Sequence, residues 1–446
     1  YNSRCTIPPS QNFKREAPQR MAISAPSPSN PSVGASSTNT AALSMVTTLF
    51  FMWGFLTSLN DILIPHLKSI FELNYAEAML IQFAFFSSYF VFSLPSGKLI
   101  DAVGYKKAMV AGLFTMGAGA FLFIPAAMVP SFPFFLIALI VLAAGMTILQ
   151  VSANPYVAVL GPERTAASRL NLAQAFNALG TTIGPLIGGF LILGAAPLAV
   201  EQLHKLSVPA LQAYRVQQAS SVKLPYLGFA LALVLLGIIM ALFHLPTIRS
   251  VERSAGASAE GDSIWKHPHL LFGALAIFVY VGAEVSIGSL LINYFHESFI
   301  ANLTLEDASR YVAFYWGGAM VGRFIGSALQ QKIRASVLLG IAAIVAALLV
   351  CASMLTFGHV AMWTIIAVGL FNSIMFPTIF TLSIEGLGPL TADGSGLLVA
   401  AIVGGAIIPL AQGALADRIG IHHAFFLPVI CYLYIAFFGF RGYRHT

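Results

Sequence analysis

The chain has 446 residues, of which 58% are hydrophobic and only 9% are charged, and its mean hydropathy is +0.83. A soluble protein of this length needs far more charged surface, so the composition excludes that class and indicates an integral membrane protein. The net charge of +6 is scattered between apolar segments, which argues against a nucleic-acid-binding face. The three cysteines form neither a disulfide framework nor a metal-ligand spacing.

Residues 1–42 precede the first apolar segment and are rich in Ser, Pro, Ala and Asn. Such a composition cannot form a packed core, so we expect a disordered cytoplasmic tail. The chain begins with Tyr and its first methionine is Met21. The sequence therefore leaves open whether residues 1–20 belong to the native protein.

Twelve apolar segments follow, each long enough for a helix across a bilayer, which needs about 20 residues. They lie near 43–66, 77–99, 107–129, 134–160, 168–194, 225–247, 268–295, 309–330, 335–357, 361–387, 394–416 and 422–441. Backbone polar groups inside a bilayer must be paired within the protein, and runs this long and apolar leave helices as the only choice. The sequence predicts an all-α membrane protein with twelve transmembrane helices.

A polar stretch at 248–267 divides these segments into six plus six. We therefore expect an N-terminal six-helix half at 43–247, a cytoplasmic linker at 248–267 and a C-terminal six-helix half at 268–446. A repeat marks the middle helix of each group of three, and its copies "SGKLIDAVG" (96–104) and "QGALADRIG" (412–420) share G-x-L-x-D-x-x-G. Four three-helix units in two halves are typical of a secondary transporter with its site at the midplane.

Lys and Arg are concentrated in the loops that would share one side of the membrane with both termini. The positive-inside rule places that side in the cytoplasm. We expect a multi-pass protein of the cell inner, or plasma, membrane with both termini in the cytoplasm.

The copy "GKLIDAVGYKK" resembles the loop signature of the major facilitator superfamily, between its second and third helices. We interpret it as a gating motif in which small residues allow helices to approach closely, an acid lies near a helix end, and two lysines meet lipid phosphates or helix C-termini. Its residues are Gly97, Asp101, Gly104, Lys106 and Lys107. The alternative is a charged turn with no gating role.

Two carboxylates, Asp61 and Glu284, lie inside apolar segments, in the first helix of each half. A carboxylate at this depth costs a few kcal/mol or more, so it persists mainly where it faces a cavity or a partner. We expect both to act in ion coupling, while the alternative for each is a structural tie to a neighbouring helix. Asn60 and Tyr280, close to these acids, are further candidates for the substrate site.

Uncharged amides fall on consistent helix faces and indicate a neutral, hydroxyl-rich ligand, because an amide both donates and accepts. Each of them could instead join helices. The candidates are Gln150 and Asn154 in the fourth helix, Asn171, Gln174 and Asn177 in the fifth, and Asn372 in the tenth.

Five motifs resemble the fucose, glucose and galactose symporter family of the major facilitator superfamily: "SLNDILIPHLK", "LQVSANPYVAVLGPE", "RLNLAQAFN", "YVGAEVSIGS" and "MFPTIFTLSIEGLG". The resemblance implies uptake of a monosaccharide driven by a cation gradient. In the fucose branch, an aspartate of the first motif and a glutamate of the second carry proton coupling and sugar binding. Asp61 matches the aspartate, but Gln150 replaces the glutamate, and Glu284 stands where that branch has glutamine.

The pair "ILQVSANP" and "VGAEVS" is similar to the glucose/galactose branch, so we expect a hexose symporter that works by alternating access as a monomer in the lipid bilayer. It would need no cofactor beyond co-transported H+ or Na+, no metal and no nucleic acid. The alternatives are a proton-coupled exporter on the same fold and uptake of another monosaccharide such as fucose. An enzyme is not expected, because the histidines lack metal or acyl-transfer spacing.

Overall fold

The computed structural model describes residues 38–71, 75–128, 131–192, 223–246 and 263–444, together with residues 1 and 2 and scattered positions between 206 and 217. Within the helices, the side chains of 59–71, 75–80, 82, 185–192, 305 and 306 lie outside the described part. Most of the expected tail and linker also lies outside it, so the proposed domain boundaries stay predictions. The described helices belong to one compact unit, Gly34–Thr446.

The first six long helices match the first six predicted segments. They are α1 (Thr40–Phe71), α2 (Tyr75–Val103), α3 (Tyr105–Met128), α4 (Phe132–Val159), α5 (Ala166–Ile192) and α8 (Lys223–Leu242), with the short helix η1 (Glu163–Thr165) before α5.

The last six predicted segments are also helical, but the final three are divided into pieces. After η2 (Ile264–Lys266) come α9 (Pro268–His296), α10 (Leu305–Leu329) and α11 (Ala335–Leu355). The tenth consists of α12 (Gly358–Asn372) and α13 (Met375–Ile384), and the eleventh of η3 (Gly388–Leu390), α14 (Thr391–Ala400), η4 (Ala401–Val403) and α15 (Gly404–Ile419). The twelfth consists of α16 (Ile421–Ala424), α17 (Phe426–Phe437) and the π-helical η5 (Phe438–Gly442).

Ten stretches of the described residues are long and apolar enough to cross a membrane. Two further long helices, α5 and α10, are not among these ten. The side chains of α5 are described only up to residue 184, and that part carries Asn171 and Gln174, while α10 carries Arg323. These two helices contact one another across the bundle. Their polar residues are therefore used, in part, in contacts inside the protein.

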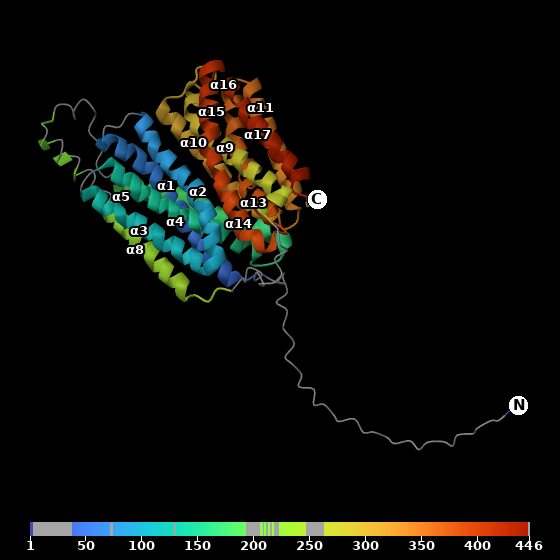
Figure 1. Cartoon of the computed structure of the whole chain (residues 1–446). Coiled ribbons are helices and arrows are strands. Elements are labelled where there is room, and N and C mark those ends of the chain that lie inside the picture. The colour runs from blue at the N-terminus through green and yellow to red at the C-terminus, as the bar shows by residue number, and fades with distance from the viewer. Residues whose placement is uncertain are drawn as a thin grey trace. The chain divides into compact units, whose positions relative to one another are not determined.

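Figure 1 shows α1–α5 and α8, in blue to yellow-green, gathered on one side of the bundle, and α9–α17, in yellow to red, on the other. Within these groups, α1 packs on α5, α3 packs on α4 and α8, and α9 packs on α15, α13 and α17. The two groups meet mainly through α2 with α14 and α5 with α10. We call the end of the bundle at which α8 ends and α9 begins the linker end.

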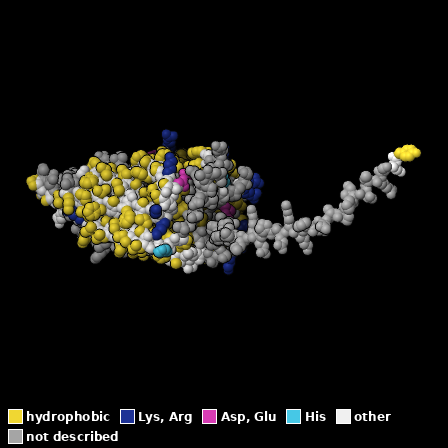
Figure 2. Space-filling model, turned by 60° about the horizontal axis from the view of Figure 1, so that its bottom comes forward, with side chains coloured by type: hydrophobic (Ala, Val, Ile, Leu, Met, Phe, Trp, Pro, Cys, Tyr) yellow, Lys and Arg dark blue, Asp and Glu magenta, His cyan; other side chains and the backbone are white. Residues whose placement is uncertain are grey.

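The outer surface is apolar, as expected for helices that face lipid. Large hydrophobic side chains such as Leu231, Leu348, Leu355 and Leu410 are exposed. In the view of Figure 2, hydrophobic side chains cover a broad continuous area, and Lys and Arg side chains are few. Together with the ten stretches that can cross a membrane, this surface shows that the chain is a multi-pass membrane protein.

Glycine permits the closest helix crossing in the first group. A Cβ on Gly54 of α1 would lie 2.0 Å from the Asn177 carbonyl oxygen, and one on Gly180 of α5 would lie 2.2 Å from that of Phe51. Neither helix could hold its place with a larger residue there.

The break between α12 and α13 differs from the continuous helix predicted for 361–387. Pro377 has no N–H to donate to the carbonyl of Ser373, four residues earlier. That carbonyl instead accepts a hydrogen bond from Arg323 Nε over 3.4 Å. A side chain from α10 thus replaces the missing backbone bond.

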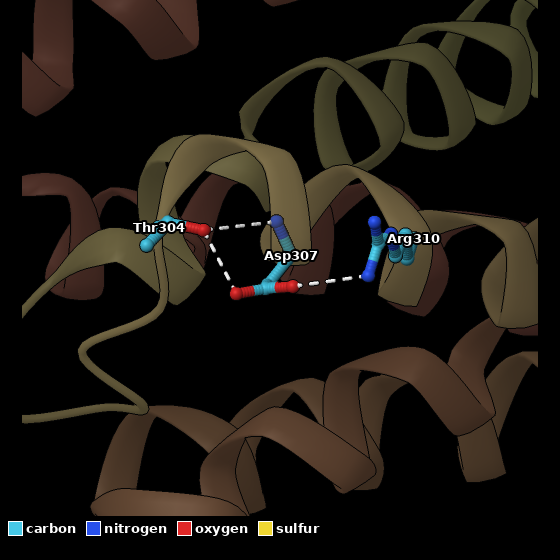
Figure 3. Close-up of polar contacts among 3 residues, drawn as sticks. All are labelled: Thr304, Asp307 and Arg310. Carbon is cyan, nitrogen blue, oxygen red and sulfur yellow. Dashed lines mark hydrogen bonds and ion pairs between the residues drawn. The ribbon is translucent and has the colours of Figure 1, made fainter.

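A local cap fixes the start of α10 (Figure 3). The Thr304 hydroxyl accepts from the Asp307 N–H over 3.1 Å and donates to Asp307 Oδ2 over 2.9 Å. Asp307 also pairs with the exposed Arg310 at 3.4 Å. The cap satisfies an otherwise unpaired N–H of the first turn, whereas the exposed ion pair adds little stability.

Candidate functional site

Side chains from α2 and α4 meet inside the first six helices. Gln150 Nε2 donates to the Tyr89 hydroxyl over 3.3 Å, and Gln150 Oε1 is buried with no hydrogen-bond partner among the described residues. Trp53 of α1 is buried and packs on Phe50, with ring centroids 5.5 Å apart. The sequence predicted Gln150 but missed Tyr89, which carries no signal beyond being a tyrosine in an apolar span.

Asn154 lies one turn after Gln150 on α4, as its spacing predicts. Its side chain is fully buried, and neither the amide nitrogen nor the amide oxygen has a partner in the described part of the chain. A buried amide with no partner costs about 1–3 kcal/mol per group, so such groups are rare without a reason. A hydroxyl-bearing ligand can satisfy both atoms.

Of two further amides of α5, Asn177 contacts a neighbouring helix. Asn177 Nδ2 donates to the Phe50 carbonyl over 2.9 Å and ties α5 to α1. Gln174 is buried, but no hydrogen bond of its side chain is described. For Asn177 the geometry favours the alternative in which the amide joins helices.

Asn171 takes part in a contact between the two groups of helices. Its Nδ2 donates to Gln330 Oε1 of α10, and Gln330 Nε2 donates to the Thr378 hydroxyl of α13 over 2.7 Å. Next to it, the Ser168 hydroxyl donates to the Ser327 carbonyl at 2.7 Å, and the Ser327 hydroxyl donates to the Ser168 carbonyl at 2.9 Å. All five side chains are buried at the linker end. We call these residues the clasp.

The last six helices contain a second polar cluster. The Tyr280 hydroxyl of α9 donates to the Asn372 carbonyl over 3.1 Å, and Asn372 Nδ2 donates to the Tyr315 hydroxyl of α10 over 2.8 Å. The Tyr315 hydroxyl in turn donates to the Glu284 carbonyl at 3.4 Å. Tyr280, Glu284 and Asn372 were predicted from the sequence, whereas Tyr315 was not.

Several polar atoms of this cluster are buried without a partner among the described residues. They are Glu284 Oε1, Asn372 Oδ1 and the hydroxyl of Tyr432 on α17. The positively charged guanidinium of Arg323 on α10 interacts electrostatically with the carboxyl group of Glu284. Acceptors and hydroxyls gathered in this way can hold a proton or a hydroxyl-rich ligand.

The gating motif lies at the linker end. A Cβ on Gly97 would lie 2.9 Å from the Ala392 carbonyl oxygen of α14, so Gly97 permits a close contact between the two groups. Lys106 Nζ donates to the Ala241 carbonyl near the end of α8 over 2.8 Å, in agreement with the expected helix C-terminus. Asp101 and Lys107 are exposed, near a helix end.

Gly104 does not serve close packing, and this part of the prediction is wrong. Nothing lies within 4 Å of a Cβ built on it, and its φ is +83°. Gly104 is needed because this backbone conformation disfavours other residues. The second copy of the motif ends in the same way, since Gly420 has φ +84°.

Asn60 and Asp61 lie on α1, whose backbone is helical throughout Thr40–Phe71. Their side chains lie outside the described part, so their assignment to the site remains a prediction. The described residues contain no group of three or more His, Cys, Asp or Glu that could hold a metal ion.

Comparisons with known proteins agree with this arrangement. The family model of the Major Facilitator Superfamily matches residues 45–401. The chain is 53% identical to a glucose/galactose transporter of Brucella abortus over 401 residues, which cover 90% of this chain and 94% of the relative. It is 35% identical to the L-fucose-proton symporter of Escherichia coli, over 90% and 93% of the two chains.

Solved structures show the same fold. A crystal structure of the E. coli fucose:proton symporter matches with a TM-score of 0.83 and 33% identity over 91% of this chain and 98% of that one. Another, described as being in the outward conformation, matches with a TM-score of 0.84 and 34% identity over 91% and 99%. The described residues form long helical segments in two groups and carry the motif at 97–107. With these matches, they show that the chain belongs to the major facilitator superfamily.

Proposed function

We propose that this protein takes up a hexose of the glucose/galactose type by cation symport with alternating access. The observation that carries the proposal is the pair Gln150 and Asn154, which are buried on one face of α4 and have three amide atoms without a partner in the described part of the chain. Relatives named glucose/galactose transporter and L-fucose-proton symporter support a monosaccharide as the substrate.

The sugar site would use neutral groups from both halves. Gln150 and Asn154 would bind sugar hydroxyls from one side. On the other side, Asn372 Oδ1 would accept from a hydroxyl and the Tyr280 ring would lie against the sugar. Amides donate and accept, which suits a ligand with several hydroxyls and no charge. Gln174 and Asn60 are kept as further candidates, whereas the Asn171 and Asn177 amide nitrogens already donate to Gln330 and to the Phe50 carbonyl.

Asp61 is the proposed coupling acid, and Glu284 is the second candidate. Removal from water favours the neutral form of a carboxylate, so Asp61 would be neutralised by an ion from outside and would release it inside. The names of the fucose relatives support a proton as this ion. One charge that crosses a membrane potential of 100 mV releases about 2.3 kcal/mol. Accumulating sugar tenfold requires about 1.4 kcal/mol, so the potential can drive more than tenfold accumulation.

The carrier would work as a monomer in the inner membrane, with both termini and the linker end in the cytoplasm. The clasp closes the bundle at that end. Opening it while the opposite end closes would expose bound sugar and ion to the cytoplasm.

Uptake into proteoliposomes tests the proposal. Labelled glucose and galactose are offered under a pure pH gradient and, separately, under a pure sodium gradient. We expect accumulation with the pH gradient. If neither gradient drives accumulation, ion coupling is disproved.

Counterflow with the same sugars separates a sugar carrier from an exporter of other small molecules. A hexose carrier exchanges labelled for unlabelled glucose or galactose without any gradient. Absence of exchange with hexoses, together with exchange of fucose, would support the fucose alternative. Absence of exchange with all three would favour the exporter.

A further inference from the structure

A cationic cavity of about 400 Å³ lies at the linker end and shares no residue with the proposed sugar site. Arg164, Lys332, Ile333 and Arg334 line it. Arg164 belongs to η1, between α4 and α5, and the other three belong to the turn between α10 and α11. The cavity is therefore built from both groups of helices.

The turn that carries Arg164 is fixed by a buried arginine. Arg169 donates through its guanidinium to the carbonyls of Val157 at 3.2 Å, Gly161 at 3.1 Å and Pro162 at 2.9 Å, and to the Thr165 hydroxyl at 2.6 Å. These bonds join the end of α4, the turn after it and the start of α5 to one side chain.

The opposite turn is also hydrogen-bonded. The N–H groups of Lys332 and Ile333 both donate to the Leu329 carbonyl, at 3.0 and 2.9 Å. Arg334 then directly precedes α11, whose first turn has no side-chain cap and carries the positive end of the helix dipole.

The clasp holds the two turns together. Ser168 lies four residues after Arg164, and Gln330 lies two residues before Lys332. Closing the clasp therefore brings Arg164 to the same cavity as Lys332 and Arg334, and opening it would separate them.

The charges of this cavity are not balanced within the described part of the chain. No described acid pairs with Arg164, Lys332 or Arg334. Glu163 adjoins Arg164 and does not line the cavity, and Arg164, Lys332 and Arg334 are exposed as Glu163 is. Three like charges repel one another, and although water and salt screen exposed charges, bringing them together has an electrostatic cost that a bound anion would offset.

We infer that this cavity binds a phosphate group and that the bound phosphate stabilises the arrangement in which the linker end is closed. Arginine presents a planar fork that matches phosphate oxygens, and lysine adds a point charge. The group could be carried by an anionic lipid headgroup or by a soluble phosphate, and both offer the same chemistry. Because Arg164 leaves the cavity when the clasp opens, the ligand binds the two arrangements unequally, as a shift in population requires.

Cross-linking of the clasp measures this effect without relying on sugar transport. The parent variant carries Ser168→Cys and Ser327→Cys, whose hydroxyl oxygens lie 3.3 Å apart in the native protein, in a background without the three native cysteines. The rate of oxidative cross-linking in a maltoside detergent reports how often the linker end is closed. Inorganic phosphate, short-chain phosphatidylglycerol, and sodium chloride at matched ionic strength are added in separate arms.

We expect phosphate, phosphatidylglycerol or both to raise the rate several-fold above chloride, and the active probe identifies the source of the group. Arg164→Gln/Lys332→Gln/Arg334→Gln should cross-link faster than the parent without ligand and should not respond to either probe. The matched control Lys98→Gln/Arg441→Gln/Arg444→Gln removes three exposed charges that do not line the cavity and should respond like the parent.

The inference is overturned if chloride is as effective as both probes, if neither probe changes the rate, or if the cavity variant still responds. None of these results bears on whether the protein carries hexose, which counterflow decides.

Discussion

Removal of Gln330 gives a quantitative test of the clasp. Gln330→Ala takes away the described partner of Asn171 Nδ2 and one bond to Thr378. Because the Asn171 side chain is fully buried here, leaving its amide unpaired costs about 1–3 kcal/mol. Water can reach the same groups when the linker end opens, so the cost falls on the closed arrangement alone.

A cost of that size corresponds to a shift of about 5- to 150-fold in the ratio of closed to open protein. The assay is Ser168→Cys/Ser327→Cys cross-linking, whose rate follows the closed fraction; the ratio of closed to open protein derived from that fraction should fall by a factor in that range. Asn177→Ala is the matched control, since it removes an amide hydrogen bond of 2.9 Å between α5 and α1, inside one group of helices. An unchanged rate in Gln330→Ala, or an equal fall in Asn177→Ala, would refute the reasoning.

Three further predictions follow from the site. Asp61→Asn should retain sugar exchange but lose accumulation in proteoliposomes, and a variant that still concentrates sugar would make Glu284 the coupling acid. Asn154→Leu removes a buried amide that has no partner among the described residues, so the unfolding temperature should stay the same or rise. Sugar affinity should fall about tenfold or more, as loss of about 1.4 kcal/mol of binding free energy implies. Lower stability with unchanged affinity would contradict a ligand role. Gly97→Val should slow clasp cross-linking because its side chain meets the Ala392 carbonyl, whereas Gly413→Val, its counterpart in the second copy, has nothing within 4 Å of the added Cβ and should not.

The helical spans could be predicted because the bilayer imposes a length and a composition on each one. The seventh segment, predicted at 268–295, is observed as α9, Pro268–His296. The break after Asn372 was not predicted. Pro377 removes one backbone bond in any helix, but whether the helix bends or divides there depends on what the freed carbonyl meets, and that is Arg323 from another helix.

The candidate site was predictable only where one helix fixes the geometry. One turn separates Gln150 from Asn154, so both fall on one face of α4 in any helical structure. Tyr315 was missed because its role comes from Asn372, 57 residues away. No spacing within a helix indicates such a partner.

Asn171 shows why a residue's place on a helix can be predicted when its partner in another helix cannot. The sequence places it on α5, but an amide there can meet sugar, a neighbouring helix or the other half, and the sequence does not distinguish these partners. The two copies of the repeat also agree only locally. Both end in a glycine with positive φ, Gly104 at +83° and Gly420 at +84°, because similar sequences adopt similar backbone conformations. Their surroundings differ, since a Cβ added to Gly97 would lie 2.9 Å from the Ala392 carbonyl oxygen, whereas one added to Gly413 would meet nothing within 4 Å. Which half contacts which glycine depends on how the two groups of helices are arranged, and an alternating-access carrier must change that arrangement to work. The residues that join the halves are therefore the ones whose partners a single sequence pattern cannot fix.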